Sequence, residues 1–279
     1  MGISHIADST YRLTVPDGSI AFELHGDAGS PLVVALPGMG DTRHAYRELA
    51  LHLAAAGYRV AALDTRGHGE SSVGWTDVTQ AAIGRDAAAL IQELGVPAAV
   101  IGHSFTPDSA VAAALLTPEL VRAVIAIAPW ASAPRQNWAM RQAMRFVTTL
   151  PWAWGWFMNS LYAVRTPATA LHRANAVRAL KRREGTVALQ KMADPKAKDA
   201  MDLRQKLAVP ALVIMGAKDP DFGNPRAEAE AYASGFANDP DVIVVEDTGH
   251  YPHVEQPDQV AEAIVRFLAE SGMPGAPRA

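Results

Sequence analysis

Three residues whose side chains could carry out nucleophilic chemistry lie far apart along the chain, in the order Ser104, Asp219, His250. Ser104 stands two residues after Gly102, between a short apolar run that predicts a buried strand and a segment that predicts a helix. A sharp strand-to-helix turn would push the serine hydroxyl clear of the backbone and place helix amides beside developing negative charge. The context therefore predicts a nucleophile, and the alternative is a serine in an ordinary strand-to-helix loop.

The other two residues have the chemistry that a serine nucleophile needs. His250 follows the last predicted strand, where its ring could take the proton of Ser104, and the alternative is a histidine in a surface loop. Asp219 follows the preceding strand, four residues after Met215, and could orient the histidine and stabilise its cationic form. Asp221 is the competing acid, which we otherwise expect to cap a turn.

Metal and cofactor sites have little support in the sequence. His253, three residues after His250, would suit a metal pair only with carboxylates nearby, and because the sequence shows no such cluster we expect it at the surface. The chain has no cysteine, which excludes disulfides, thiolate metal sites and a cysteine nucleophile. We expect no metal and no organic cofactor.

Composition limits the class of protein. The chain has 279 residues and a net charge of −4, with both signs interspersed and no Lys/Arg run, so we expect no nucleic-acid partner and no attraction to an anionic membrane. No apolar run approaches the roughly 18 residues of a membrane span, and the first ten residues do not resemble a signal peptide. A reducing cytoplasm is the expected location.

Short apolar runs alternate with segments of helical periodicity over most of the chain. Strands are predicted at 11–15, 19–25, 32–36, 59–63, 98–101, 121–127, 211–215 and 242–245, and helices at 43–56, 78–94, 109–116, 226–234 and 259–270. Continuous apolar strands alternating with helices indicate an α/β fold with a mostly parallel sheet covered on both faces. The tail after Ser271 is predicted to be loose.

The alternation stops between Trp130 and about Gln205, a stretch that holds five of the six tryptophans. We interpret residues 130–205 as a helical insertion, with helices at 141–149 and 158–165, and residues 1–129 with 206–279 as the core. Trp152, Trp154 and Trp156 alternate with small residues, which favours an extended segment with all three indoles on one face. That face either looks down on Ser104 or packs against the helices of the insertion, and the segment could also touch a lipid surface.

The segment around Ser104 resembles the nucleophile turn of the α/β-hydrolase family, which reads G-x-S-x-G. Thr106 stands where the second glycine is usual, and we expect it to cap the following helix, with Pro107 at the first helical position. Residues 64–71 resemble the D-x-R-G-x-G-x-S loop of the family, for which we expect a structural role, His68 included. The resemblance covers nearly the whole chain outside 130–205, the region that forms a cap over the site in this family.

The resemblance also implies two amides that bind an oxyanion, those of Phe105 and Met39. Phe105 follows the nucleophile, and Met39 lies after the third predicted strand, where Pro37 replaces a histidine that the family often has. Dehalogenases and epoxide hydrolases of the family use an aspartate nucleophile, so Ser104 argues against both.

The expected activity is therefore hydrolysis of a carboxylic ester, lactone or thioester through an acyl-enzyme on Ser104. The alternatives are a C–C bond hydrolase or perhydrolase with the same triad, or a non-catalytic ligand-binding protein, as plant hormone receptors of the family are. The expected partner is a small molecule with an apolar acyl or alcohol part, and the sequence carries no signal for oligomeric state. The tryptophans expected to contact it are Trp130, Trp152, Trp154 and Trp156.

Overall fold

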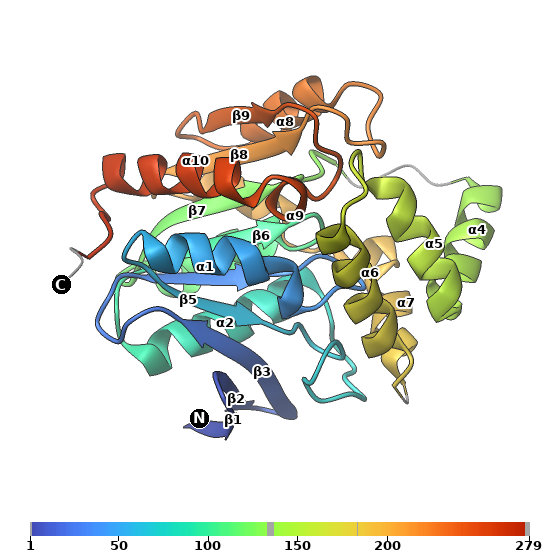
Figure 1. Cartoon of the computed structure of the whole chain (residues 1–279), viewed down its shortest axis with the longest axis horizontal. Helices are drawn as coiled ribbons and strands as arrows, with labels where there is room; N and C mark the ends of the chain where they lie inside the picture. Colours follow the sequence, from blue (N-terminus) through green and yellow to red (C-terminus); the bar gives the residue numbers. More distant parts are fainter. Residues whose placement is uncertain (1, 133–136, 183, 277–279) are drawn as a thin grey trace.

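A nine-stranded sheet forms the centre of the molecule (Figure 1). The computed structural model describes residues 2–132, 137–182 and 184–276. The strands run across the sheet in the order β1-β2-β3-β5-β4-β6-β7-β8-β9. Their bounds are β1 Gly2–Ala7, β2 Thr10–Val15, β3 Gly18–His25, β4 Leu32–Leu36, β5 Arg59–Leu63, β6 Ala98–His103, β7 Val121–Ile127, β8 Ala211–Gly216 and β9 Asp241–Val245.

The direction of the strands determines where the candidate residues meet. Strands β5, β4, β6, β7, β8 and β9 pair in parallel, whereas β1, β2 and β3 form antiparallel pairs at one side and β3 joins β5 antiparallel. The carboxyl ends of neighbouring parallel strands lie at the same edge, which is the usual ligand edge of open α/β sheets. Met39 follows β4, Ser104 follows β6, Asp219 follows β8 and His250 follows β9, so all four lie at this edge.

Helices cover both faces of the sheet, as the alternation predicts. On one face α1 (Arg47–Ala55) packs against α10 (Pro257–Glu270), and a 3₁₀ turn over Arg43–Tyr46 precedes α1. On the other face α2 (Gln80–Leu94) packs against α3 (Pro107–Leu116). The helix α8 (Pro225–Ala233) joins this second layer, because the Tyr232 hydroxyl donates to the Asp108 carboxylate of α3 at 3.1 Å. Strands β4, β6 and β8 are buried along their whole length, which explains their continuous apolar sequences.

The chain between β7 and β8 forms helices in the part that the structure describes. They are α4 (Trp138–Thr149), α5 (Pro151–Leu161), α6 (Pro167–Leu180) and α7 (Gly185–Met192), followed by 3₁₀ turns at Pro195–Ala197 and Met201–Lys206. Figure 1 places α4 to α7 together at one side of the sheet. No strand occurs in residues 137–182 or 184–206, as expected for a helical insertion, and residues 133–136 and 183 lie outside the described part.

Within this insertion the prediction of an extended segment is wrong. Residues 151–161 form the single helix α5, so the expected helix at 158–165 is also wrong, because its first residues are the last turn of α5. Helical spacing puts Trp152 and Trp156 on one side and Trp154 on the other, and the three indoles do not share a face. The exposures agree, because Trp154 is buried whereas Trp152 and Trp156 are exposed.

Three further features differ from the prediction. The strand β1 and the short helix α9 (Pro252–Glu255) had no predicted counterpart. The C-terminal tail is packed rather than loose as far as it is described: the Ala276 amide donates to the Gly57 carbonyl at 2.9 Å, and the Tyr58 hydroxyl donates to the Met273 carbonyl at 2.9 Å. Residues 277–279 of this tail lie outside the described part. No helix in residues 2–132, 137–182 or 184–276 is long and apolar enough to cross a membrane.

Candidate active site

Ser104 occupies a strained turn between β6 and α3. Its φ is +57°, a left-handed conformation that residues with a Cβ rarely adopt and that is concentrated at functional sites. A Cβ at Gly102 would lie 2.3 Å from the Thr106 carbonyl oxygen and 2.5 Å from the Pro107 nitrogen, so only glycine fits there. The turn therefore depends on Gly102, and Ser104 remains partly exposed at its tip.

Thr106 does not cap α3 through its side chain, contrary to the expectation. It precedes the helix, with Pro107 in the first turn as predicted, but its side chain makes no capping bond. The hydroxyl instead donates to the Leu36 carbonyl at 2.8 Å and accepts from the His103 amide at 3.0 Å. Thr106 is fully buried, and it ties the turn that carries Ser104 to the end of β4, a bond that the glycine usual at this position in the family could not make.

Replacing Thr106 by valine is expected to lower the free energy of unfolding by about 1–3 kcal/mol, because the buried His103 amide loses its acceptor. Thr106→Ser is the matched control, since it keeps the hydroxyl and loses one methyl group, worth about 0.8 kcal/mol. Urea unfolding of the three proteins measures the difference. Equal stability of the valine variant and the wild type would show that the hydroxyl bonds contribute nothing.

His250 and Asp219 form a buried pair at the carboxyl edge of the sheet. His250 Nδ1 lies 2.7 Å from Asp219 Oδ2, and both side chains are almost fully buried. The loops that carry them are linked, because the Lys218 amide donates to the Thr248 carbonyl at 2.8 Å. The His250 amide donates to the Leu161 carbonyl at the end of α5 at 2.9 Å, so the inserted helices also hold this loop.

Asp221 does not have the turn-capping role that we expected. Its carboxylate lies 3.7 Å from His250 Nδ1 and faces the cavity described below. The turn is capped by Asp219 instead, whose Oδ1 accepts the Asp221 amide at 3.0 Å. Asp219, Asp221 and His250 are the one group in the described residues whose ligand atoms lie within 4.8 Å of one another in a way that could hold a metal. Because His250 Nδ1 is already bonded to Asp219, we interpret the group as two carboxylates around one imidazole.

This arrangement changes the acidity of the histidine. Burial favours the neutral ring, but the charges of Asp219 and Asp221 outweigh it and raise the pKa of His250 from 6.5 to about 9. Burial also raises the pKa of Asp221, an effect to which the charge of Asp219 adds. His250 is therefore a stronger base than an ordinary histidine.

His103 and His253, whose rings lie near His250, are both buried. The expectation of a surface position for His253 is therefore wrong. His253 is completely buried in α9, with its ring stacked on Tyr46 at a centroid distance of 5.0 Å, and neither ring nitrogen has a partner among the described residues. His103 donates from Nε2 to the His250 carbonyl at 2.9 Å. Burial lowers the pKa of both rings well below the usual value, so they are neutral.

Two backbone amides beside Ser104 are available to bind an oxyanion. In the part of the chain that the structure describes, the amides of Met39 and Phe105 donate to no other group. The next amide in the loop, that of Gly40, donates to His68 Nε2 at 3.2 Å, while His68 Nδ1 contacts the Arg66 carbonyl at 3.0 Å. His68 therefore has the structural role that the sequence predicts, because it holds the loop that carries Met39.

The inserted helices also hold the loop that carries Met39. Trp154 of α5 donates from Nε1 to the Gly40 carbonyl at 3.1 Å. His172 of α6 places Nε2 at 2.8 and 2.9 Å from the two carboxylate oxygens of Asp41, and its Nδ1 lies 2.8 Å from the Tyr162 hydroxyl. The position of the Met39 amide thus depends on side chains more than 100 residues away in the sequence.

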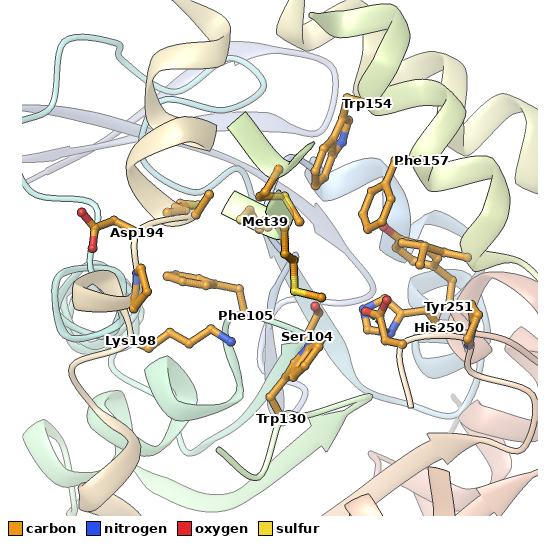
Figure 2. Close-up of a pocket in the computed structure, with 18 residues that line it drawn as sticks. Met39, Ser104, Phe105, Trp130, Trp154, Phe157, Asp194, Lys198, His250 and Tyr251 are labelled. Carbon is orange, nitrogen blue, oxygen red and sulfur yellow. Dashed lines mark ion pairs between the residues drawn. The ribbon is translucent and has the colours of Figure 1, made fainter. Parts of the chain in front are cut away.

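A cavity of about 360 Å³ lies over these groups (Figure 2). Ser104, Phe105 and His250 line its floor, and Figure 2 shows the Ser104 hydroxyl on the side where His250 lies. Its walls are mostly apolar and come from the Met39 loop and the inserted helices. They include Trp130, Met140, Met144, Trp154, Phe157 and Leu161.

Of the four tryptophans predicted to contact a substrate, Trp130 and Trp154 line the cavity. Trp152 and Trp156 do not, because they lie on the opposite side of α5 and are exposed. Sequence reasoning also missed Lys198, whose Nζ lies 4.8 Å from the centre of the Trp130 ring within the cavity wall. Burial lowers the pKa of Lys198 to about 8, and no local sequence pattern points to this residue.

Comparisons with known proteins agree with the fold. A model of the alpha/beta hydrolase family matches residues 33–263. A thermophilic esterase from Thermogutta terrifontis, solved with malate bound, has 26% identity and a TM-score of 0.78, over 93% of this chain and 98% of the esterase. The esterase EaEST from Exiguobacterium antarcticum has a similar fold, with 21% identity and a TM-score of 0.78 over 90% of this chain and 96% of that one.

One curated relative matches over a shorter stretch. The sn-1-specific diacylglycerol lipase ABHD11 of Mus musculus is 32% identical over 106 residues, which are 37% of this chain and 34% of the lipase. The match thus spans about a third of the length of that relative. Since the family model covers most of the chain and the sheet has the arrangement of that fold, this protein belongs to the alpha/beta hydrolase family.

Proposed function

We propose that this hydrolase cleaves a carboxylic ester, lactone or thioester through an acyl-enzyme on Ser104. Ser104 attacks the acyl carbon, His250 takes the hydroxyl proton and passes it to the leaving group, and Asp219 stabilises the resulting imidazolium. Water then attacks the acyl-enzyme with His250 again as the base, which releases the acid and restores Ser104.

The observation that carries the proposal is the strained Ser104 at the floor of a cavity that also contains the buried His250–Asp219 pair. A left-handed serine costs of order 1–3 kcal/mol, and such strain persists where the surrounding structure enforces it for a function. The 2.7 Å contact at Nδ1 places a proton on that nitrogen, which leaves Nε2 as the basic atom toward the cavity.

The Met39 and Phe105 amides stabilise the negative charge that develops on the substrate oxygen when Ser104 attacks. Both are free to donate, and preorganised donors near a developing oxyanion are worth about 2.7–4 kcal/mol each. The protein uses bonds from Thr106, His68, Trp154 and His172 to fix this loop, which keeps reorganisation during the reaction small.

The walls of the cavity favour an apolar acyl or alcohol part of the substrate. We propose that residues 130–205 act as a cap over a core of residues 1–129 and 206–279, since their helices supply most of the wall. Trp130 and Trp154 are the proposed aromatic contacts. The diacylglycerol lipase relative and the esterase neighbours fit a substrate of this kind.

Labelling with a fluorophosphonate, followed by peptide mass spectrometry, tests the proposal. We expect one adduct, on the peptide that contains Ser104, and turnover of p-nitrophenyl esters that falls once the acyl chain exceeds what the cavity of about 360 Å³ holds. Labelling of Ser104 without turnover of any ester would favour a C–C hydrolase or perhydrolase. Failure to label would favour the ligand-binding alternative.

Activity is expected to rise with pH through an apparent pKa of about 9, well above the usual histidine value. Neutral His250 is the base, and Asp219 and Asp221 stabilise its protonated form. The pH dependence of kcat/KM for a short ester, with the rate of the Ser104→Ala protein subtracted, measures this value.

The Asp221→Asn variant sharpens the test. It removes a negative charge 3.7 Å from His250 Nδ1, so the midpoint is expected to move to lower pH while the plateau rate changes little. A profile that is flat between pH 7 and 10, or a midpoint that Asp221→Asn leaves in place, would contradict the assignment of His250 as the titrating base.

A further inference from the structure

The exposed aromatic residues of the described chain are concentrated on two helices. Every exposed tryptophan and phenylalanine lies on α4 or α5, with exposed fractions of 71% for Trp138, 52% for Phe146, 63% for Trp152 and 71% for Trp156. Phe146 and Trp152 meet edge to face at 5.8 Å, so the aromatics of the two helices are contiguous. Exposed apolar surfaces of this kind mark contacts with another molecule.

These residues face away from the cavity. On α4, Trp138 and Phe146 lie on the side opposite Met140 and Met144, which line the cavity, and the exposed Arg141 and Arg145 lie along the flank between the two sides. On α5, Trp152 and Trp156 are one turn apart and opposite the buried Trp154. The two helices therefore have an inner side that lines the cavity and an outer side that carries the exposed aromatic residues.

The charge around this surface is strongly one-sided. Residues 130–183 contain eight arginines and one lysine but no aspartate or glutamate. The net charge of −4 thus divides into +9 for this stretch and −13 for the rest of the chain, which revises the expectation that both signs are interspersed. Arg141 and Arg145 of α4 are exposed, and neither forms an ion pair among the described residues.

We propose that this outer surface, made by Trp138, Phe146, Trp152 and Trp156 with Arg141 and Arg145, binds the surface of an anionic lipid bilayer. Tryptophan is the side chain most enriched at the boundary between headgroups and acyl chains. Cations beside it gain from the negative potential of anionic headgroups. Because residues 130–183 contain no aspartate or glutamate, this part of the chain does not repel anionic headgroups as the acidic remainder would.

Proteins that bind single-stranded nucleic acid stack its bases on aromatic side chains within a positively charged groove, whereas these four aromatic side chains are exposed on the outer side of two helices, away from the cavity. A second copy of this chain would bring the same positive charge against itself, because a symmetric contact places like surfaces together. The anionic bilayer is the occupant that satisfies both the aromatic residues and the charge. Binding places α4 and α5, whose inner sides line the cavity, between the lipid and the cavity.

Flotation with vesicles tests the proposal without any need for turnover, so its outcome is independent of the proposed hydrolysis. The full-length protein, and the same protein with Ser104→Ala to prevent hydrolysis of lipid, are mixed with vesicles of phosphatidylcholine and phosphatidylserine. We expect binding at low salt, loss of most of it near 1 M salt, where charges are screened beyond about 3 Å, and much weaker binding to phosphatidylcholine alone. Quenching of tryptophan fluorescence by brominated lipid is expected to accompany binding.

Variants separate the contribution of the arginines to vesicle binding from that of the tryptophans. Since each cation near an anionic surface contributes about fivefold in partitioning, Arg141→Gln with Arg145→Gln is expected to weaken binding roughly 25-fold. Trp152→Ser with Trp156→Ser is expected to weaken it at least about tenfold and to remove most of the quenching. The matched controls are Arg266→Gln on α10 and Leu51→Ser on α1, both exposed and distant from α4 in Figure 1, which are expected to change binding less than about twofold.

Melting temperatures show that the variants are folded, and these exposed substitutions are expected to change them little. Absence of binding to the anionic vesicles, or binding that both paired variants retain, would overturn the proposal. Sedimentation velocity tests the other occupant. A dimer that Trp152→Ser with Trp156→Ser dissociates would assign the surface to a second copy and would overturn the lipid proposal.

Discussion

Ser104→Ala is expected to lower kcat/KM for ester hydrolysis by about three orders of magnitude or more, with the protein still folded. The substitution removes the attacking atom and leaves the oxyanion amides and the cavity in place, so a small residual rate over water is expected. Alanine keeps the Cβ of serine, and the strain at φ +57° is unchanged. Near-normal turnover after removal of host esterases would contradict the role of Ser104.

Ser109 supplies the matched control for this experiment. It is a fully buried serine in α3, one turn beyond Ser104, and its hydroxyl has no partner among the described residues. Ser109→Ala therefore removes no hydrogen bond and is expected to change both kcat/KM and the free energy of unfolding only slightly. A large loss of activity in this control would mean that the turn itself is sensitive to any change in α3.

Asp219→Asn is expected to lower kcat by about 10³–10⁴, whereas Asp221→Asn costs less than about tenfold. Asparagine at 219 keeps the shape of the side chain, but its neutral amide cannot stabilise the imidazolium, and its NH₂ group can force His250 into the wrong tautomer. Asp221 acts on His250 only through its charge at 3.7 Å, compared with the 2.7 Å hydrogen bond of Asp219.

Steady-state kinetics at a pH above the apparent pKa of His250 separate the two variants, because the base is then neutral in both. If Asp221→Asn were the more damaging change, the acid would be Asp221. A moderate loss in each variant with complete loss in the double variant would mean that the two carboxylates substitute for each other.

The strands of the core were predictable because their signal is local. Strands β4, β5 and β7 begin and end at the predicted residues, since each is mostly apolar and is buried in a parallel sheet except for Arg59 and Arg122 near the strand starts. The same reasoning placed Ser104 at the end of a buried strand and before a helix, and the structure has that arrangement. Strand β1 was missed because four of its six residues are exposed at the edge of the sheet, so its sequence has no buried apolar run.

Unlike the bounds of the strands, the choice between Asp219 and Asp221 depends on contacts between segments that are distant in the sequence. Spacing after β8 favours Asp219, but two carboxylates in one turn both come near His250, and the difference of 1.0 Å between their contacts follows from how the two loops are bonded to each other. Likewise, nothing in the sequence near Thr106 reveals that its hydroxyl reaches the Leu36 carbonyl, 70 residues earlier in the chain.

The sequence by itself determined the alternation of the core, the order of the three candidate residues and the helical character of the insertion. Only the tertiary structure decided the conformation of residues 151–156. Pro151 and Gly155 suggested an extended segment, yet Pro151 occupies the first turn of α5, where its missing amide costs nothing. A Cβ at Gly155 would lie 2.6 Å from a methyl group of Val177, so glycine is there to let α6 approach α5 closely. The sequence pattern of a loop and that of a tightly packed helix coincide at this point, and the packing partner that distinguishes them lies 22 residues further along the chain.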